Sequence, residues 1–224
     1  MKKINIAIDG PSAAGKGTIA DCLAEKLSYI HLDTGAMYRC VALACLRAEV
    51  PFKDEERVME ILEDVDIDQT ADGRSILNGE DVSEAIRHPE ISLGASDVST
   101  LKLVRKDLVR RQKKIARRKG YILEGRDIGT VVLKNAELKI YLTASVEVRA
   151  MRRYKQNLEK GMECNLEEIC RQISERDYQD MHRKESPLKK ADDAVEVDSS
   201  DLSIEEVTEV VYDLAMERIN RLNG

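Results

Sequence analysis

The chain has 224 residues, which is enough for one core with a small insertion and too few for two full α/β domains. Its formal net charge of −6 argues against a general nucleic-acid or membrane binder, and no apolar stretch approaches the length of a membrane span. The five cysteines form no C-x-x-C pair and no leader peptide is recognisable. We therefore expect a reduced, cytoplasmic chain without disulfides or a metal cage.

Short apolar runs alternate with helical patterns along the chain. The first run, residues 4–8, leads through a glycine loop into a predicted helix over 18–27. Further strands are predicted at 29–32, 121–123, 138–142 and 194–197, and further helices at 36–47, 101–119, 146–160, 166–184 and 204–222, the last with a capping box at Ser203 and Glu206. This alternation predicts an α/β fold in which helices cover a parallel sheet, with ligands at the carboxyl ends of its strands.

Residues 65–83 break the alternation. Apolar residues alternate with acids, and hairpin signals follow as Asp-Gly at 72–73 and Asn-Gly at 78–79, which predicts a small antiparallel insertion. The acids between 64 and 68 are spaced as in a calcium loop. However, Gln69 stands where such a loop needs glycine and the later glutamate is missing, so a strand with one solvated face is the better interpretation.

The sequence "GPSAAGKGT", residues 10–18, predicts a phosphate-binding loop. Successive backbone N–H groups at a helix N-terminus can converge on anionic oxygens, glycines permit close approach, and Lys16 adds a positive charge. The alternative is a glycine-rich turn with an incidental lysine, but the preceding strand and following helix favour a nucleoside triphosphate such as ATP.

The residue after Lys16 is Gly17, and the hydroxyl comes one position later, in Thr18. The serine or threonine that ligates Mg²⁺ in motor and switch ATPases and GTPases is therefore displaced. We expect Mg²⁺ to be held mainly by nucleotide phosphates and water, with no protein residue as its direct ligand. The G-K-G-T spelling resembles that of nucleoside monophosphate kinases and indicates phosphoryl transfer between nucleotides.

Two further strand ends could bind anions. Thr34 and Gly35 open a helix that carries Arg39, which gives a helix N-terminus beside a guanidinium group. A capped helix with a surface arginine is the alternative. The strand near 121–125 ends on Arg126 and Asp127, which could bind phosphate and order metal-bound water, or could form a simple strand-end salt bridge.

Basic residues gather in two other segments. Residues 102–119 carry ten of them. We expect most of these to lie on a solvated helix face, although Arg105 or Arg110 could reach an acceptor. Two later helices, separated by a turn at Gly161, form either an exposed charged hairpin or a flap that closes over the triphosphate. Their arginines are Arg149, Arg152, Arg153, Arg171, Arg176 and Arg183.

Motifs across almost the whole chain together resemble the bacterial cytidylate kinase family. They are "IDGPSAAGKGT", "LDTGAMYR", "NGEDVSEAIR", "LVRRQ", "GRDIGTVV", "ERDYQD" and "PLKKADDAVEVDSS". The resemblance implies Mg²⁺-dependent, in-line transfer of the ATP γ-phosphate to CMP or dCMP by a cytoplasmic monomer. It also implies a five-stranded parallel core in residues 1–61 and 98–224, a CMP-binding insertion at 62–97 and a short helical lid at 153–180.

The resemblance assigns roles to individual positions. It implies ATP binding by Gly10, Pro11, Ser12, Ala13, Ala14, Gly15, Lys16, Gly17, Thr18 and Arg152, and catalytic roles for Lys16, Arg126, Asp127 and Arg176. It implies CMP binding by Thr34, Arg39, Ser96, Arg105, Arg126, Asp127, Arg176, Asp180 and Arg183. Within this set Ser96 is expected at the cytosine, and Arg176 and Asp180 near the pentose.

One position departs from the family pattern, because Glu124 stands where aspartate is frequent. Two other functions remain as alternatives. The acceptor could be a different nucleotide or a small alcohol such as shikimate, or the chain could be an ATP-binding regulatory module without turnover.

Overall fold

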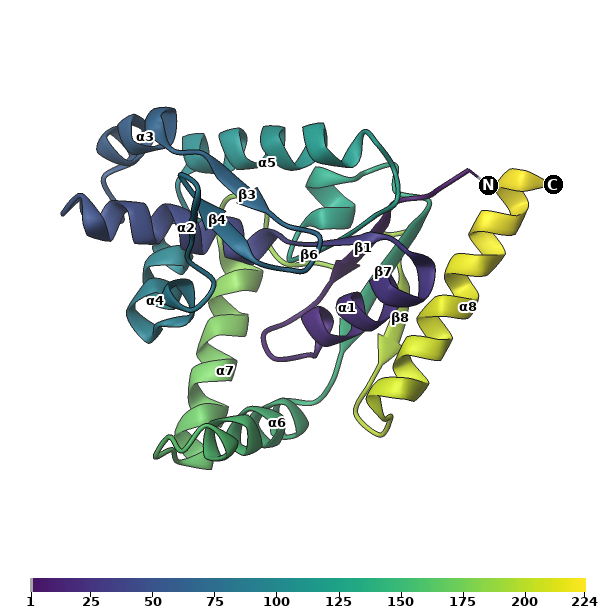
Figure 1. The fold of residues 1–224 in the computed structure, drawn as a ribbon. Helices are drawn as coiled ribbons and strands as arrows, with labels where there is room; N and C mark the ends of the chain where they lie inside the picture. The colour runs from purple at the N-terminus through teal and green to yellow at the C-terminus, as the bar shows by residue number, and fades with distance from the viewer. Residues whose placement is uncertain (1) are drawn as a thin grey trace. The chain divides into compact units, whose positions relative to one another are not determined.

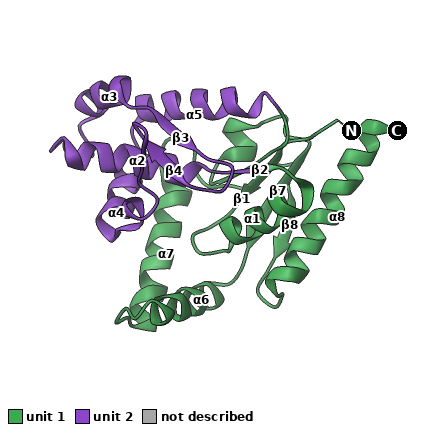
Figure 2. Ribbon diagram, viewed as in Figure 1, with its two compact units in different colours: residues 1–29, 119–224 green, residues 30–118 purple. Residues whose placement is uncertain are grey.

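The computed structural model describes residues 2–224 (Figure 1). It contains two compact units, residues 1–29 with 119–224 and residues 30–118 (Figure 2). The first unit contains β1 (Ile6–Asp9), α1 (Lys16–Leu27), β6 (Tyr121–Gly125), the π-helical turn η2 (Ile128–Val132), β7 (Leu138–Thr143), α6 (Val146–Glu159), α7 (Leu166–His182), β8 (Val195–Asp198) and α8 (Ile204–Asn223). The second contains β2 (Ile30–Asp33), α2 (Thr34–Arg47), α3 (Glu55–Asp64), β3 (Ile67–Gln69), β4 (Ser75–Leu77), β5 (Glu80–Asp81), the 3₁₀ turn η1 (Ala85–Arg87), α4 (Pro89–Val98) and α5 (Lys102–Ala116).

The main sheet is parallel and has five strands in the order β2-β6-β1-β7-β8. Strand β1 pairs in parallel with both β6 and β7, so that Asp9 lies opposite Gly125 on one side and Tyr141 on the other. The carboxyl ends of these strands therefore meet at one edge, where the phosphate loop and the segment after Gly125 both begin. The predicted parallel α/β core is confirmed.

The apolar strands of the first unit are buried because helices pack against the sheet. Ile6 and Ile8 of β1 are fully inaccessible and share one hydrophobic cluster with Ile140 of β7. Helix α1 contributes Leu23 to the same cluster, and α8 contributes Val211. The fourfold spacing of apolar residues in both helices places them on a single face, which is the pattern expected of amphipathic helices.

The second unit contains the small antiparallel sheet that the hairpin signals predict, with the order β3-β4-β5. Ile67 of β3 lies opposite Leu77 of β4, and both are buried. Asn78 and Gly79 join β4 to β5 with φ values of 51° and 81°, the left-handed pair that a two-residue hairpin requires. The antiparallel insertion is therefore confirmed, whereas its limits at 62–97 stay a prediction.

Several helix boundaries differ from the sequence prediction. Helix α2 begins at Thr34 rather than 36, because the Asp33 side chain accepts the Ala36 N–H and caps it. Helix α1 begins at Lys16 rather than Thr18, so the last residues of the phosphate loop already belong to the helix. Helices α3 and α4 were not predicted. No helix within residues 2–224 is long and apolar enough to cross a membrane.

Candidate active site

The phosphate loop joins β1 to α1 and contains two residues in the left-handed region, Ala13 with φ 59° and Gly15 with φ 89°. Left-handed residues within such a turn direct neighbouring N–H groups into a shared concavity that suits anions. A Cβ atom at Gly10 would collide with the Leu142 carbonyl oxygen, so only glycine fits there. Among the described residues, no side chain caps the start of α1, which leaves its first N–H groups available to a ligand.

Lys16 is buried at the base of this loop, with 6% of its surface exposed. Its Nζ donates to the Pro11 carbonyl oxygen at 2.8 Å. Burial, reinforced by the nearby Arg126, lowers the pKa of Lys16 to about 7, although Glu124, Asp9 and Asp180 act in the opposite direction. A bound triphosphate would favour the charged lysine, because an opposite charge stabilises the protonated form.

Asp9 ends β1 and is almost entirely buried. Its two carboxylate oxygens accept the backbone N–H groups of Ile128 and Gly129, each at 2.7 Å. Burial raises the pKa of Asp9 to about 6, although these two hydrogen bonds act in the opposite direction. Asp9 therefore ties the root of the phosphate loop to the turn that follows Arg126 and Asp127. The sequence prediction used it only as a strand end.

Four of the predicted CMP-binding residues gather in the first unit. Arg126 donates through Nε to Asp180 Oδ2 at 2.8 Å, and Arg183 lies 3.7 Å from both Asp127 Oδ1 and Asp180 Oδ1. Burial opposes ionisation of Asp180, but Arg126, with smaller contributions from Arg183 and Arg176, outweighs it and holds the pKa of Asp180 below its ordinary value. The group thus concentrates guanidinium charge near Lys16, whose pKa responds to Arg126 and Asp180.

Glu124 belongs beside the phosphate loop, although it was left out of the predicted site. A Cβ atom built at Gly17 would lie 2.9 Å from Glu124 Oε1, so this carboxylate stands next to the position from which the hydroxyl is missing. Its charge also raises the pKa of Lys16. The signal in the sequence was its place at the end of β6, directly before Gly125.

Two of the predicted ATP-binding residues, Ser12 and Arg152, have partners that the sequence did not reveal. The Ser12 N–H donates to Asp177 Oδ1 at 3.1 Å, and Arg149 donates to the Ser12 carbonyl oxygen at 2.9 Å. Arg152, predicted to bind ATP, donates to the hydroxyl and carbonyl oxygens of Ser199 at 3.1 and 2.5 Å. Arg149 and Asp177 were missed as site residues because their partner is a backbone 137 and 165 residues away.

The acceptor-side residues of the second unit centre on the end of β2. Asp33 accepts from Arg39 Nη2 at 2.6 Å and caps α2 through Ala36. Burial opposes ionisation, but Arg39 and the Ala36 N–H outweigh it, so the pKa of Asp33 lies below its ordinary value. The Gln69 amide holds the Asp33 backbone through both of its polar atoms, at 2.9 and 2.6 Å. Thr34, which follows, is buried.

Arg105, rather than Arg110, is the buried arginine of α5. Its Nη1 donates to the Ser99 carbonyl oxygen at 3.1 Å, and its guanidinium lies 5.5 Å from the centre of the Tyr38 ring. The side chain of Arg110 is 72% exposed and pairs with Asp107 on its own helix. Ser96 lies in α4 and donates to the carbonyl oxygen one turn earlier, at 3.3 Å.

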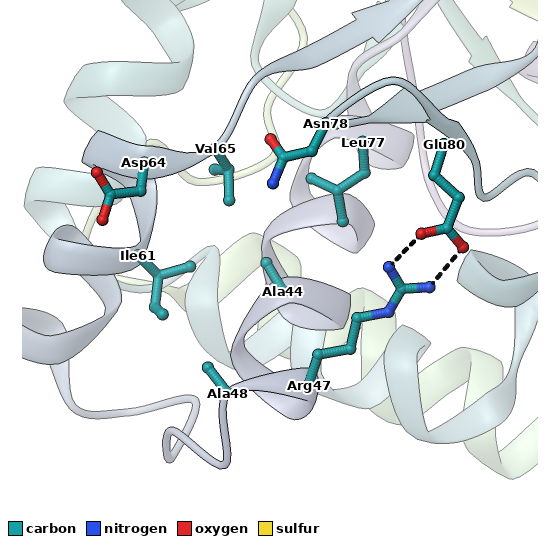
Figure 3. A pocket seen from close by; sticks show the side chains of 9 residues that line it. All are labelled: Ala44, Arg47, Ala48, Ile61, Asp64, Val65, Leu77, Asn78 and Glu80. Carbon is teal, nitrogen blue, oxygen red and sulfur yellow. Dashed lines mark hydrogen bonds and ion pairs between the residues drawn. The ribbon is translucent and has the colours of Figure 1, made fainter.

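A pocket of about 390 Å³ in the second unit contains none of the predicted site residues (Figure 3). It lies where α2 and α3 end, beside the β4–β5 hairpin, and the bidentate pair Arg47–Glu80 closes one side at 2.7 and 2.8 Å. Its lining residues are Ala44, Arg47, Ala48, Ile61, Asp64, Val65, Leu77, Asn78 and Glu80. Phosphate loops bind by backbone amides in a shallow turn, so a pocket elsewhere in the molecule does not argue against this site.

Comparison with known proteins identifies the family. The family model described as cytidylate kinase matches residues 6–217. The chain belongs to the cytidylate kinase family. It is 51% identical over 217 residues to a cytidylate kinase from Caldicellulosiruptor bescii, covering 96% of both chains. It is 49% identical over 218 residues to one from Bacillus anthracis, covering 96% of this chain and 97% of the relative.

Solved structures agree with this membership at the level of the fold. A protein from Thermus thermophilus superimposes with a TM-score of 0.51 at 17% identity, covering 97% of this chain and 98% of the other. An uncharacterised protein from Eubacterium ventriosum gives a TM-score of 0.54 at 11% identity, covering 96% and 99%. The family membership makes the chain a nucleoside monophosphate kinase.

Proposed function

We propose that the chain transfers the γ-phosphate of ATP to CMP or dCMP, giving ADP and CDP or dCDP. The observation that carries the proposal is the position of Lys16: it lies in a phosphate loop and is electrostatically coupled to Arg126 and Asp180. A charged lysine and guanidinium groups together can neutralise the charge that develops on the phosphoryl group during its transfer.

The chain's groups supply positioning and charge rather than a covalent intermediate. Loop N–H groups from Ala13 to Thr18 would hold the donor phosphates, and Lys16 would contact the outer ones. The acceptor phosphate is already ionised near neutral pH, so it needs no general base. Direct in-line transfer follows, with Arg126 and Arg183 beside the moving group and Asp180 and Asp127 fixing those arginines.

Mg²⁺, when bound with the nucleotide, supplies charge neutralisation at the β- and γ-phosphates. Gly17 offers no hydroxyl to it, and the Asp9 oxygens are committed to two backbone N–H groups. Glu124 is the carboxylate next to position 17 and would hold metal-bound water there. The residues present thus fit a metal held chiefly by phosphate oxygens.

On the acceptor side, the start of α2 and Arg39, oriented by Asp33, form an anion site for the CMP phosphate. Ser96 would recognise cytosine, while Arg176 and Asp180 would lie near the pentose and decide the acceptance of dCMP. That residues of both units contact one CMP molecule stays a prediction. Since both nucleotides are cytoplasmic metabolites, we also propose a cytoplasmic enzyme, acting as a monomer.

A coupled assay with CMP, dCMP, UMP and AMP tests the proposal. We expect turnover with CMP and dCMP to exceed that with UMP or AMP, and a preference for AMP would contradict it. Lys16→Ala should abolish product formation. Replacing Arg126 should reduce kcat more than ATP affinity, because its charge is needed most in the transition state. Retained biological function without turnover would favour an ATP-binding regulatory module.

A further inference from the structure

A buried ion pair between helices α6 and α7 contacts the phosphate loop. Arg149 near the start of α6 and Asp177 in the last turns of α7 are 4% and 7% exposed, and Arg149 Nη1 lies 2.6 Å from Asp177 Oδ2. Both also bind Ser12: Asp177 Oδ1 accepts its N–H at 3.1 Å, and Arg149 Nη1 donates to its carbonyl oxygen at 2.9 Å. Arg149 Nε is fixed in turn by the Ala144 carbonyl oxygen at 2.9 Å.

These contacts fix both polar backbone groups of one loop residue. Ser12 immediately precedes Ala13, which adopts the left-handed conformation with φ 59° that opens the anion concavity. Left-handed backbone at a non-glycine residue is costly and persists only where its surroundings hold it. Hydrogen bonds to charged groups are stronger than those between neutral groups, so the ion pair can supply that constraint.

We propose that Arg149 and Asp177 are positioning residues that preorganise the phosphate loop for ATP by clamping Ser12. The inference deepens the proposed function, since it concerns the ATP side of that same site. It follows that the Ser12 N–H is directed to Asp177 rather than to the triphosphate, and the cradle is formed by the amides after it.

The clamp also links the loop to the helical hairpin. Helices α6 and α7 pack together through Ala150, Ile169 and Ile173, and the ion pair lies at the two ends of the hairpin that join the core. Asp177 falls inside the predicted lid, 153–180. A lid movement that displaced Asp177 would break a buried ion pair and pull on Ser12, so movement should be confined to the part of the hairpin beyond this pair.

The test must remove both charged side chains together. Removing one partner of a buried ion pair leaves an unpaired buried charge and is strongly destabilising, whereas replacing both partners by apolar residues is often tolerated. The test variant is therefore Arg149→Met with Asp177→Leu. A matched control, Arg47→Met with Glu80→Leu, removes a bidentate pair whose hydrogen bonds lie within the second unit.

Binding of Mg²⁺–ATP is measured by calorimetry without an acceptor, and hydrogen exchange is measured at the Ser12 amide. We expect the test variant to remain folded with ATP affinity weakened about ten- to hundredfold, faster exchange at Ser12 and an unchanged KM for CMP. The control should match the wild type. The proposal would be overturned if the Ser12 amide exchanged faster than in the wild type while the ATP affinity stayed unchanged.

If the double variant does not fold, Arg149→Lys keeps the charge beside Asp177 but loses the fork that reaches both Ser12 and Ala144. Weakened ATP affinity in this variant supports the clamp, and wild-type affinity refutes it. A wild-type chain that binds ATP but fails to phosphorylate CMP would refute the proposed function alone, since calorimetry with ATP needs no acceptor.

Discussion

Two aspartates end parallel strands in equivalent places, yet the protein treats them in opposite ways. Asp9 ends β1 and Asp33 ends β2, and each precedes a segment rich in anion-binding features. The pKa of Asp9 is raised by burial to about 6, whereas the pKa of Asp33 is lowered, because Arg39 and the Ala36 N–H outweigh its burial.

The difference lies in the partners. Asp9 has two neutral backbone donors and a like charge, Asp127, whose effect on its pKa is upward. Asp33 has a guanidinium at 2.6 Å. Two amide donors, even with Lys16 nearby, do not compensate fully for the desolvation of Asp9, whereas a hydrogen-bonded guanidinium with an amide does so for Asp33. Asp9 therefore serves to hold backbone together, and Asp33 serves to orient a charge.

The largest expected effect concerns the backbone role of Asp9. Asp9→Ala would leave the Ile128 and Gly129 N–H groups buried without an acceptor, at a cost of about 2 to 6 kcal/mol in the free energy of unfolding. Urea denaturation measures this. Asp9→Asn keeps one acceptor oxygen and should lose less. Equal stability of Asp9→Ala and the wild type would show that these amides find other partners.

The opposite pKa shifts predict opposite pH dependence. Folded Asp9 keeps its proton to about pH 6, whereas unfolded Asp9 loses it near 3.8, so the folded state binds more protons between these values. Its contribution to stability should therefore fall by roughly 3 kcal/mol as pH rises through this range. Asp33 has a lowered pKa, so its contribution is present above its ordinary value and lost as pH falls below it.

Urea denaturation at a series of pH values separates the two. Subtracting the Asp9→Asn curve from the wild-type curve should give a descending difference between about pH 4 and pH 6. Subtracting an Asp33→Asn curve should give a difference that rises with pH at the acidic end. Differences of the same sign would contradict the assignment of the two carboxylates.

A smaller effect is expected from Asp33→Ala, which removes a helix cap and the partner of Arg39. We expect a loss of about 0.5 to 2 kcal/mol in unfolding free energy, the usual cost of an N-cap. The KM for CMP should also rise, because Arg39 loses its orientation. Asp54→Ala is the matched control, since Asp54 caps α3 through the Arg57 N–H at 3.3 Å without holding an arginine side chain. A KM change in both variants would indicate a stability effect only.

Local sequence patterns predicted most strands and helices but not the contacts between segments that are distant in the sequence. The glycine spacing predicted the strand, loop and helix around Lys16, and Asn78-Gly79 predicted its hairpin, because each depends on neighbouring residues. Helices α3 and α4 escaped prediction: α3 buries only Val58 and Leu62 among acids, and α4 contains a glycine.

The contacts that the sequence did not reveal share a different cause. Asp9 binds backbone 119 and 120 residues later, and Arg126 pairs with Asp180 54 residues away. No periodicity or motif spacing encodes which side chain meets which backbone across such distances. The resemblance to a family named Arg126 and Asp180 individually, but their ion pair appears only when β6 and α7 are placed in the fold.

The smallest expected effect concerns Lys16, the cation of the phosphate loop that follows Asp9. Glu124 raises the pKa of Lys16, so Glu124→Gln should move it below about 7 and reduce the fraction of charged lysine at neutral pH. ATP affinity measured against pH should then have its midpoint at lower pH than the wild type. Glu209→Gln, an exposed acid paired with Lys26, is the control. A midpoint that stays in place or rises would mean that Glu124 does not govern the charge of Lys16, and that burial, Arg126, Asp9 and Asp180 set it.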